Sequence, residues 1–232
     1  MSRKYEREVS IQATPEAVWR AISEAEGLKS WFAPEARVTP EVGGEIWISW
    51  GPGMEGGSQI EIWEPNRHQR ISQGRGEDRE PSVIDFQIEA RDGETTTLRL
   101  VQSGFGEGAN FDDEVESTSH AWPLFLLLLK LGAERGYRRV KNVSVFRLID
   151  LSREEAWQRL QEVLPSGERI HFDPFGNVCV RMPGGNLLAV FCEKCGGSTS
   201  ITVMYILYDA SPEEESAAKG TVEEIASSPV AP

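Results

Sequence analysis

The apolar run from residue 120 to residue 131, HAWPLFLLLLKL, constrains the fold of this chain more than any other feature. At about a dozen residues it is shorter than the roughly 20 that a helix needs to cross a bilayer. A surface helix has a polar face, and this run has no polar side chain between Ala121 and Leu129. We therefore predict a buried helix that is covered on all sides by two layers of structure.

The ends of this helix are also marked in the sequence. Asp112, Asp113 and Glu114 place negative charge where the helix dipole favours it, and Gly136 follows Arg135 as a terminator. We expect the helix to run from about residue 112 to residue 135.

The chain before this helix reads as one strand, two short helices and six further strands. Residues 4–13 alternate between the two faces of a half-buried strand, and Thr14 with Pro15 then forms a helix start. A shorter helical turn follows Gly27 and ends before Pro34. Period-two segments separated by Gly and Pro turns then predict an antiparallel meander with one apolar face. The predicted strands are 36–39, 45–50, 58–63, 67–73, 82–90 and 95–103.

Several short segments in this part of the chain together resemble one known family. They are residues 13–22 (ATPEAVWRAI), 31–34 (WFAP), 42–44 (VGG), 57–65 (GSQIEIWEP), 97–100 (TLRL) and Trp122. In order and spacing they are similar to the START-like (SRPBCC) superfamily, in the branch of the activator of heat-shock-protein-90 ATPase homologue family. The chain departs from the family pattern where Ala121 replaces a glycine and Pro123 follows the tryptophan. The resemblance implies an α+β helix-grip fold, with a curved antiparallel sheet wrapped on a long C-terminal helix over an apolar cavity.

A weak internal repeat indicates that a smaller copy of this fold follows. Thr14, Glu16, Trp19 and Ile22 recur as Ser152, Glu154, Trp157 and Leu160, at one offset of 138 residues. We therefore predict a helix-grip domain at 1–136, a smaller degenerate α+β copy at 137–226, and a flexible tail at 227–232. In the copy we expect strands at 143–149, 169–172, 177–182, 187–192 and 200–208, and a polar helix at 212–226. We expect the copy to cover the second face of the apolar helix.

The charge and the cysteine content narrow the classes of partner. A net charge of −13 argues against binding to nucleic acid or to anionic membranes, both of which need a surplus of Lys and Arg. The first residues carry no apolar signal-peptide core, and the 3 cysteines make no disulfide framework. We expect a cytoplasmic protein, monomer or homodimer, with no cofactor.

Aromatic residues that could line a cavity between the helix and the sheet are the candidates for a ligand site. Such sites are mostly apolar, with a few polar groups that orient the ligand, although the same side chains could simply fill a core. Their buried N–H groups need partners, which a ligand oxygen could supply. The predicted ligand-binding residues are Trp31, Phe32, Trp50, Phe86, His120, Trp122 and Phe125.

Catalytic and metal chemistry find less support in the sequence. His68, beside a turn, is expected to be exposed, and His120 is the better candidate for a general base, but no nucleophile with a matched base can be recognised. The segment CEKCGG has the outline of a zinc knuckle at Cys192 and Cys195, with only Cys179 and His171 as further ligands. We favour a β-hairpin with both thiols at its tip, and we predict no catalytic residue and no metal site.

Charged segments could serve as docking surfaces, but solvated helix starts and loops are commoner. The charged loop 74–80 is the example nearest the expected cavity mouth, where Arg75 or Arg79 could pair with an acidic ligand.

The function implied by the resemblance is binding of a small hydrophobic or aromatic ligand. Two alternatives stay open, a co-chaperone-like module that binds a protein partner and a polyketide-cyclase-like enzyme. Fold alone does not decide among them.

Overall fold

The computed structural model describes residues 3–74, 80–106, 108, 111–136, 139–195 and 197–230. Arg75 and Arg79 of the charged loop lie outside these residues. The chain divides into two compact units, the first formed by Met1–Val115 and Leu126–Tyr137 and the second by Glu116–Phe125 and Arg138–Pro232. The predicted boundary after residue 136 differs from this division, because it placed residues 116–125 in the first domain.

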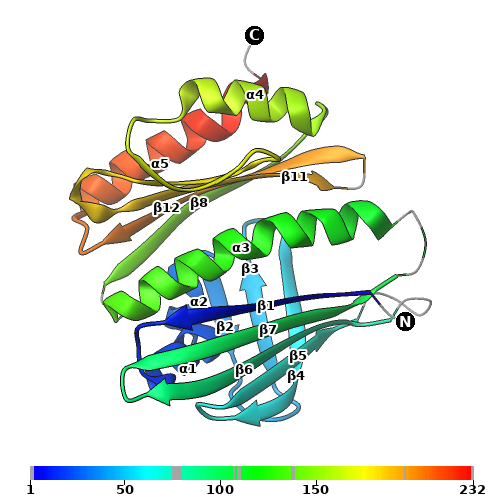
Figure 1. Cartoon of the computed structure of the whole chain (residues 1–232). Helices are drawn as coiled ribbons and strands as arrows, with labels where there is room; N and C mark the ends of the chain where they lie inside the picture. Colours follow the sequence, from blue (N-terminus) through cyan, green and yellow to red (C-terminus); the bar gives the residue numbers. More distant parts are fainter. Residues whose placement is uncertain are drawn as a thin grey trace. The chain divides into compact units, whose positions relative to one another are not determined.

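The first unit has the predicted order of one strand, two helices, six strands and a long helix (Figure 1). Its strands form one antiparallel sheet in the order β1-β7-β6-β5-β4-β3-β2, so that the first strand pairs with the last. The sheet curves around helix α3, which confirms the helix-grip architecture. The elements are β1 (Arg3–Ile11), α1 (Pro15–Ser23), α2 (Ala25–Trp31), β2 (Glu35–Val38), β3 (Glu45–Ser49), β4 (Glu55–Glu64), β5 (His68–Gln73), β6 (Ser82–Asp92), β7 (Thr95–Phe105) and α3 (Asp112–Arg135).

Helices α1 and α2 start and meet as their sequences require. The Thr14 side chain accepts a hydrogen bond from the Ala17 N–H, and Pro15 occupies the first turn of α1. The two helices approach closely at Gly27, where a Cβ atom would lie 1.9 Å from the Arg20 carbonyl oxygen. Only glycine fits this crossing.

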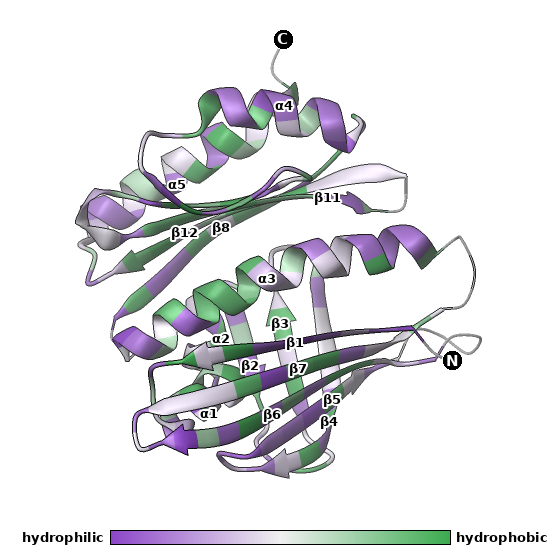
Figure 2. Cartoon of the chain, in the orientation of Figure 1, coloured by the Kyte–Doolittle hydropathy of each residue, from purple (hydrophilic) through white to green (hydrophobic). Residues whose placement is uncertain are grey.

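The inner face of the first sheet is apolar, as the period-two pattern predicts. Phe86 of β6 pairs with Leu100 of β7, and Ile88 pairs with Leu98; all four are buried. Asp85 and Gln87, on either side of Phe86 along β6, lie on the outer face. The alternation of hydrophobic and hydrophilic residues along these strands is visible in Figure 2.

Helix α3 has the predicted bounds and ends at Gly136, which has a left-handed φ of 76°. Hydrophobic residues gather in its middle (Figure 2), and no residue from 120 to 131 is exposed. In the first unit, Lys130 Nζ donates to the Ser10 carbonyl at 2.7 Å, and Glu134 accepts from the Gln12 N–H at 2.9 Å. That the second copy covers the other face of the helix stays a prediction.

The second unit repeats the strand order of the first with five strands instead of seven. Its sheet has the order β8-β12-β11-β10-β9, so that here too the first strand pairs with the last. Helices α4 and α5 lie on one face of this sheet (Figure 1). The elements are β8 (Val140–Ile149), α4 (Arg153–Val163), β9 (Glu168–Asp173), β10 (Asn177–Arg181), β11 (Leu187–Cys195), β12 (Ser198–Tyr208) and α5 (Pro212–Ser227), with 3-10 turns at Pro183–Gly185 and Ser228–Val230.

The repeated residues have the same roles in both units. Ser152 caps α4 through a capping box with Glu155, as Thr14 caps α1. Trp157 and Leu160 are buried in the second core, as Trp19 and Ile22 are in the first. The second unit is therefore a truncated α+β copy.

The C-terminal helix α5 was expected to be polar, but one side of it contributes to the core of the second unit. Val222, Ile225 and Ala226 of α5 belong to the same core as Trp157. In chain order α5 is the counterpart of α3. The chain was expected to be flexible from residue 227, but Ser228–Val230 forms a 3-10 turn in which Pro229 is buried.

Candidate functional site

Three of the predicted ligand-binding aromatics form one cluster in the first unit. The rings of Trp31 and Phe32 lie 4.9 Å apart, and those of Phe32 and Trp50 lie 5.1 Å apart. Trp31 Nε1 donates to the Ala21 carbonyl and Trp50 Nε1 to the Phe32 carbonyl, both at 2.9 Å. Since the main chain already satisfies both indole N–H groups, neither needs a ligand oxygen.

Phe86 lies on the inner face of the sheet, and its neighbour there is a polar residue that sequence reasoning missed. Gln69 of β5 pairs with Phe86 on one side and with Trp63 of β4 on the other. Trp63 in turn packs edge-on against Trp19 of α1, with ring centroids 4.9 Å apart. Gln69 therefore sits in a row of aromatic side chains that face the interior.

The Gln69 amide is buried and unpaired. The residue is 1% exposed, and neither Oε1 nor Nε2 has a hydrogen-bond partner within the part of the chain that the structure describes. The buried hydroxyls of Ser23 and Thr96 in this unit do have partners, because both donate to main-chain carbonyls at 2.6 Å. An unpaired buried amide is costly, and a hydrogen-bonding partner at Gln69 would remove that cost. Its period-two position beside Ile71 is the one signal in the sequence that could have found it.

The remaining predicted residues, His120, Trp122 and Phe125, lie on the part of α3 that belongs to the second unit. Phe125 stacks on Phe191 of β11 at 4.4 Å and meets Trp122 edge-on at 6.0 Å. The structure thus divides the seven predicted residues between the two units. A ligand role for each of them stays a prediction.

His120 has an orienting partner that the sequence could not reveal. Its Nδ1 lies 2.6 Å from Asp173 Oδ2, and the other Asp173 oxygen accepts from the Phe175 N–H at 2.9 Å. The Phe175 ring packs against the imidazole with centroids 4.9 Å apart. Because a carboxylate only accepts, Nδ1 carries the proton in this pair, and a neutral ring then leaves Nε2 as the basic nitrogen.

A buried carboxyl group lies in the same unit. Glu193 of β11 is 8% exposed and accepts from Asn177 Nδ2 at 2.7 Å. Burial raises the pKa of Glu193 to about 7; the Asn177 hydrogen bond and the Arg153 charge oppose this rise, and the Asp173 charge adds to it. Arg153, also 8% exposed, donates to Glu116 of α3 at 3.1 Å.

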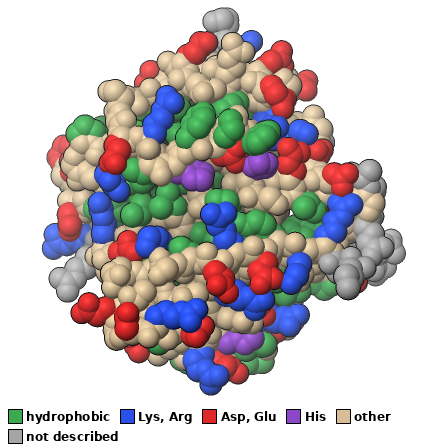
Figure 3. Space-filling model, viewed as in Figure 1, with side chains coloured by type: hydrophobic (Ala, Val, Ile, Leu, Met, Phe, Trp, Pro, Cys, Tyr) green, Lys and Arg blue, Asp and Glu red, His purple; other side chains and the backbone are tan. Residues whose placement is uncertain are grey.

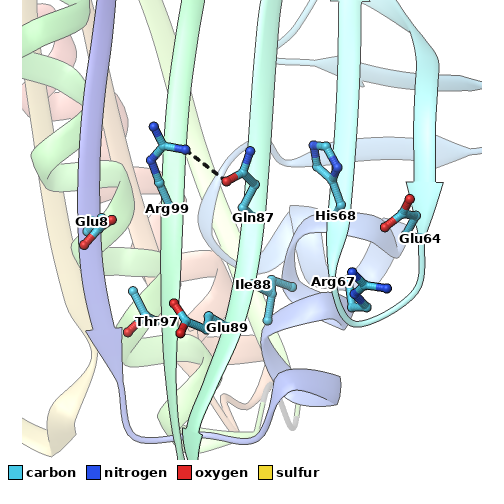
Figure 4. Close-up of a pocket in the computed structure, with 9 residues that line it drawn as sticks. All are labelled: Glu8, Glu64, Arg67, His68, Gln87, Ile88, Glu89, Thr97 and Arg99. Carbon is cyan, nitrogen blue, oxygen red and sulfur yellow. Dashed lines mark hydrogen bonds between the residues drawn. The ribbon is translucent and has the colours of Figure 1, made fainter.

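The outer face of the first sheet carries an open polar pocket of about 290 Å³ (Figure 4). Arg99 donates to Glu6 at 2.6 Å and to Gln87 at 3.0 Å, and Gln87 donates to Asp85 at 3.2 Å. Asp85 also lies 3.1 Å from His68 Nε2. His68 is therefore not the exposed side chain that was expected, because Asp85 holds it and its side chain is 23% exposed. The pocket is lined by Glu8, Glu64, Arg67, His68, Gln87, Ile88, Glu89, Thr97 and Arg99.

Charges of both signs line this pocket, so it selects no simple anion or cation. Basic and acidic side chains are likewise interspersed on the face of this unit seen in Figure 3.

The family of the chain follows from a sequence comparison that agrees with this architecture. Residues 12–131 match the model of the family described as activator of Hsp90 ATPase homolog 1-like protein. The chain belongs to this family. The match covers the first unit's grip up to the end of the apolar run, and Gln69, Phe86 and His120 all lie inside it.

Solved structures similar to this family member share the fold of the first unit. A protein from Mesorhizobium loti is 24% identical with a TM-score of 0.51, over 57% of this chain and 98% of that one. The Aha1 dimer from Colwellia psychrerythraea is also 24% identical with a TM-score of 0.51, over 58% of this chain and 98% of that one. At this identity the likeness shows the fold alone. No curated protein sequence matches the chain significantly.

The cysteines of this family member lie in the second unit and do not share one face. Cys192 and Cys195 lie three positions apart on β11, so their side chains point to opposite sides of the sheet. Cys192 is buried with its Sγ 3.7 Å from the Arg153 carbonyl, and Cys195 is exposed. The hairpin of β11 and β12 is as expected, but only Cys195 lies at its tip. Among the described residues no group of three or more His, Cys, Asp or Glu is arranged to hold a metal ion.

Within the described ranges, no helix is both long enough and apolar enough to cross a bilayer.

Proposed function

We propose that the first unit binds a small apolar or aromatic molecule against the inner face of its sheet. The observation that supports this proposal is the unpaired Gln69 amide between Trp63 and Phe86. Buried polar groups in native proteins are nearly always hydrogen-bonded, and a ligand that brings a polar group to this apolar face would supply the missing bonds. Phe86 then supplies apolar contact area beside the amide.

A ligand screen tests this proposal on the full chain. Aromatic molecules and single-chain lipids are added to the protein, and thermal shift is read together with native mass spectrometry. A molecule present at 100 times its dissociation constant should stabilise the folded state by about 2.7 kcal/mol. Phe86→Ala should weaken binding, and Phe172→Ala on the exposed edge of the second unit should not. Binding that is equal in the wild type and in the Phe86 variant would place the ligand elsewhere.

A second candidate function is acid–base catalysis, and the His120–Asp173 pair favours it. An oriented imidazole can remove a proton next to a carbonyl group, which is a step of polyketide cyclisation. Exchange of the methylene protons of an aryl β-diketone in D₂O, followed by NMR, tests this function. The wild type should accelerate the exchange and His120→Ala should not; equal rates for the two would exclude this role for His120.

A protein-binding role is the remaining alternative, and it rests on the comparisons. The family description refers to an activator of the Hsp90 ATPase, and the Colwellia psychrerythraea protein is a dimer. Light scattering on the full chain would reveal a homodimer. Association with a purified Hsp90-type chaperone, measured by sedimentation with and without nucleotide, would support the co-chaperone reading.

A further inference from the structure

We propose that Gln69 makes the first unit selective for flat aromatic molecules that carry a neutral hydrogen-bond donor and acceptor side by side, such as a carboxamide or a lactam. The inference rests on the proposed function, because it assigns the chemistry of that same binding site.

The donor and acceptor inventory of Gln69 sets the kind of group it selects. Oε1 can accept a hydrogen bond and Nε2 can donate one, and both atoms are buried without a partner. A second amide satisfies both atoms at once through two parallel hydrogen bonds. A ketone or an ether satisfies only the donor and leaves Oε1 unpaired.

The neighbours of Gln69 set the shape and charge of the ligand. Trp63 and Phe86 lie directly opposite Gln69 on the two adjacent strands, and side chains in such positions are about 5 Å apart at Cβ. The amide is therefore flanked by aromatic rings, against which a flat ring can pack. Neither of these direct neighbours is a cation, so an ionised carboxylate would be desolvated there without compensation, and a neutral amide is favoured.

The backbone of Gln69 is fixed by strand pairing on both sides. Its strand β5 lies inside the sheet, paired on both sides by β4 and β6. The preference for an amide ligand therefore does not depend on a mobile segment. On the next strand, Gln87 faces outward, where Arg99 and Asp85 satisfy its amide. The chain therefore contains two glutamines that can be compared. The Gln69 amide is unpaired on the inner face of the sheet, and the Gln87 amide is hydrogen-bonded on the outer face.

Two probes of nearly identical shape test the inference. In 2-naphthamide and methyl 2-naphthyl ketone the only difference is an NH₂ group in place of a CH₃ group. Dissociation constants are measured by calorimetry on the full chain for the wild type, Gln69→Met and the control Gln87→Met. We expect the wild type and the control to prefer the amide by roughly tenfold or more, and Gln69→Met to bind both probes equally.

A second readout reports on the Gln69 side chain itself. In ¹H–¹⁵N spectra, the side-chain NH₂ resonances of Gln69 should move on addition of the amide, by more than on addition of the ketone. Equal affinity of the wild type for both probes, or a preference that survives in Gln69→Met, would overturn the inference but leave the proposed function standing. If no aromatic probe binds to the wild type, the proposed function fails as well.

Discussion

The unpaired amide of Gln69 has a direct consequence for the stability of the unliganded protein. Replacing Gln69 by Met removes two unsatisfied polar atoms and keeps the length of the side chain. The free energy of unfolding should therefore rise, by about 1–3 kcal/mol. Gln87→Met is the matched control and should lower it, because Gln87 has both of its hydrogen bonds. Urea denaturation measures both changes, and a loss of stability in Gln69→Met would mean that the amide is already satisfied.

Glu193 predicts a pH dependence of stability with a definite sign. The folded state raises the pKa of Glu193 from 4.5 to about 7, mainly because the carboxyl group is buried. Between these values the folded state binds more protons than the unfolded state. The stabilising contribution is therefore complete below pH 4.5, falls as the pH rises to about 7, and then stays level. The loss is at most about 3 kcal/mol.

Glu193→Gln isolates this effect, because it keeps an acceptor for Asn177 and cannot titrate. The difference in unfolding free energy between wild type and variant, measured in urea from pH 5 to 8, should change over this range. A difference that is independent of pH would contradict the assignment to Glu193.

The three cysteines should react at very different rates. Burial raises the pKa of Cys179 and of Cys192 to about 12, so that neither forms a thiolate readily, and Cys195 is exposed. A maleimide should label the native protein at Cys195 alone, as read by mass spectrometry. Cys195→Ser should remain unlabelled until it is denatured, and rapid labelling of Cys192 would show that β11 opens.

At this scale the sequence predicts types of residue better than their partners. It singled out His120 as the better base, but Asp173 lies 53 residues away and only the fold brings the two together. It left a ligand oxygen open as a partner for the indole N–H groups, whereas main-chain carbonyls already accept from Trp31 and Trp50. Hydrogen-bond partners distant in sequence leave no local pattern. For Gln69, the period-two pattern could place the residue on the inner face, but it could not show that the amide lacks a partner.

At the scale of elements, the crossing of α1 and α2 at Gly27 is a sharp test. Gly27→Ala would place a Cβ atom 1.9 Å from the Arg20 carbonyl oxygen, so the helices would have to move apart. We expect a loss of about 1–3 kcal/mol or more in unfolding free energy. Gly220→Ala in α5 is the control, because a Cβ there meets nothing within 4 Å. That change should stabilise the helix by about 0.5–1 kcal/mol. Thermal unfolding measures both, and an unchanged Gly27→Ala variant would contradict the tight crossing.

The helices and strands themselves were largely predictable, because each has a local cause. Alternation defined β6 and β7, a capping residue and Pro15 defined α1, and Gly136 ended α3 as predicted. Helix α5 was undervalued because its apolar stripe is narrow. Three acidic residues in its first turn dominate its composition, although Val222 and Ile225 enter the core.

At the scale of the whole molecule, a fragment of residues 1–136 should be less stable than the full chain and should self-associate. It would keep Phe125 but lose Phe191, on which that ring stacks, together with Asp173, the partner of His120. We expect the fragment to self-associate in light scattering, and we expect Phe125→Glu to reduce this association. A monomeric fragment as stable as the full chain would show that residues 116–125 do not need the second unit.

Helix α3 belongs to one copy of the sequence repeat but is divided between the two compact units. The sequence repeat assigns the entire helix to the first copy, since α5 is its counterpart in the second. The compact units assign residues 116–125 to the second copy instead. The border of the sequence repeat and the border of the compact units therefore differ. A chimera that exchanges second copies between related chains should carry residues 116–125 along with the incoming copy, although the repeat begins only after them.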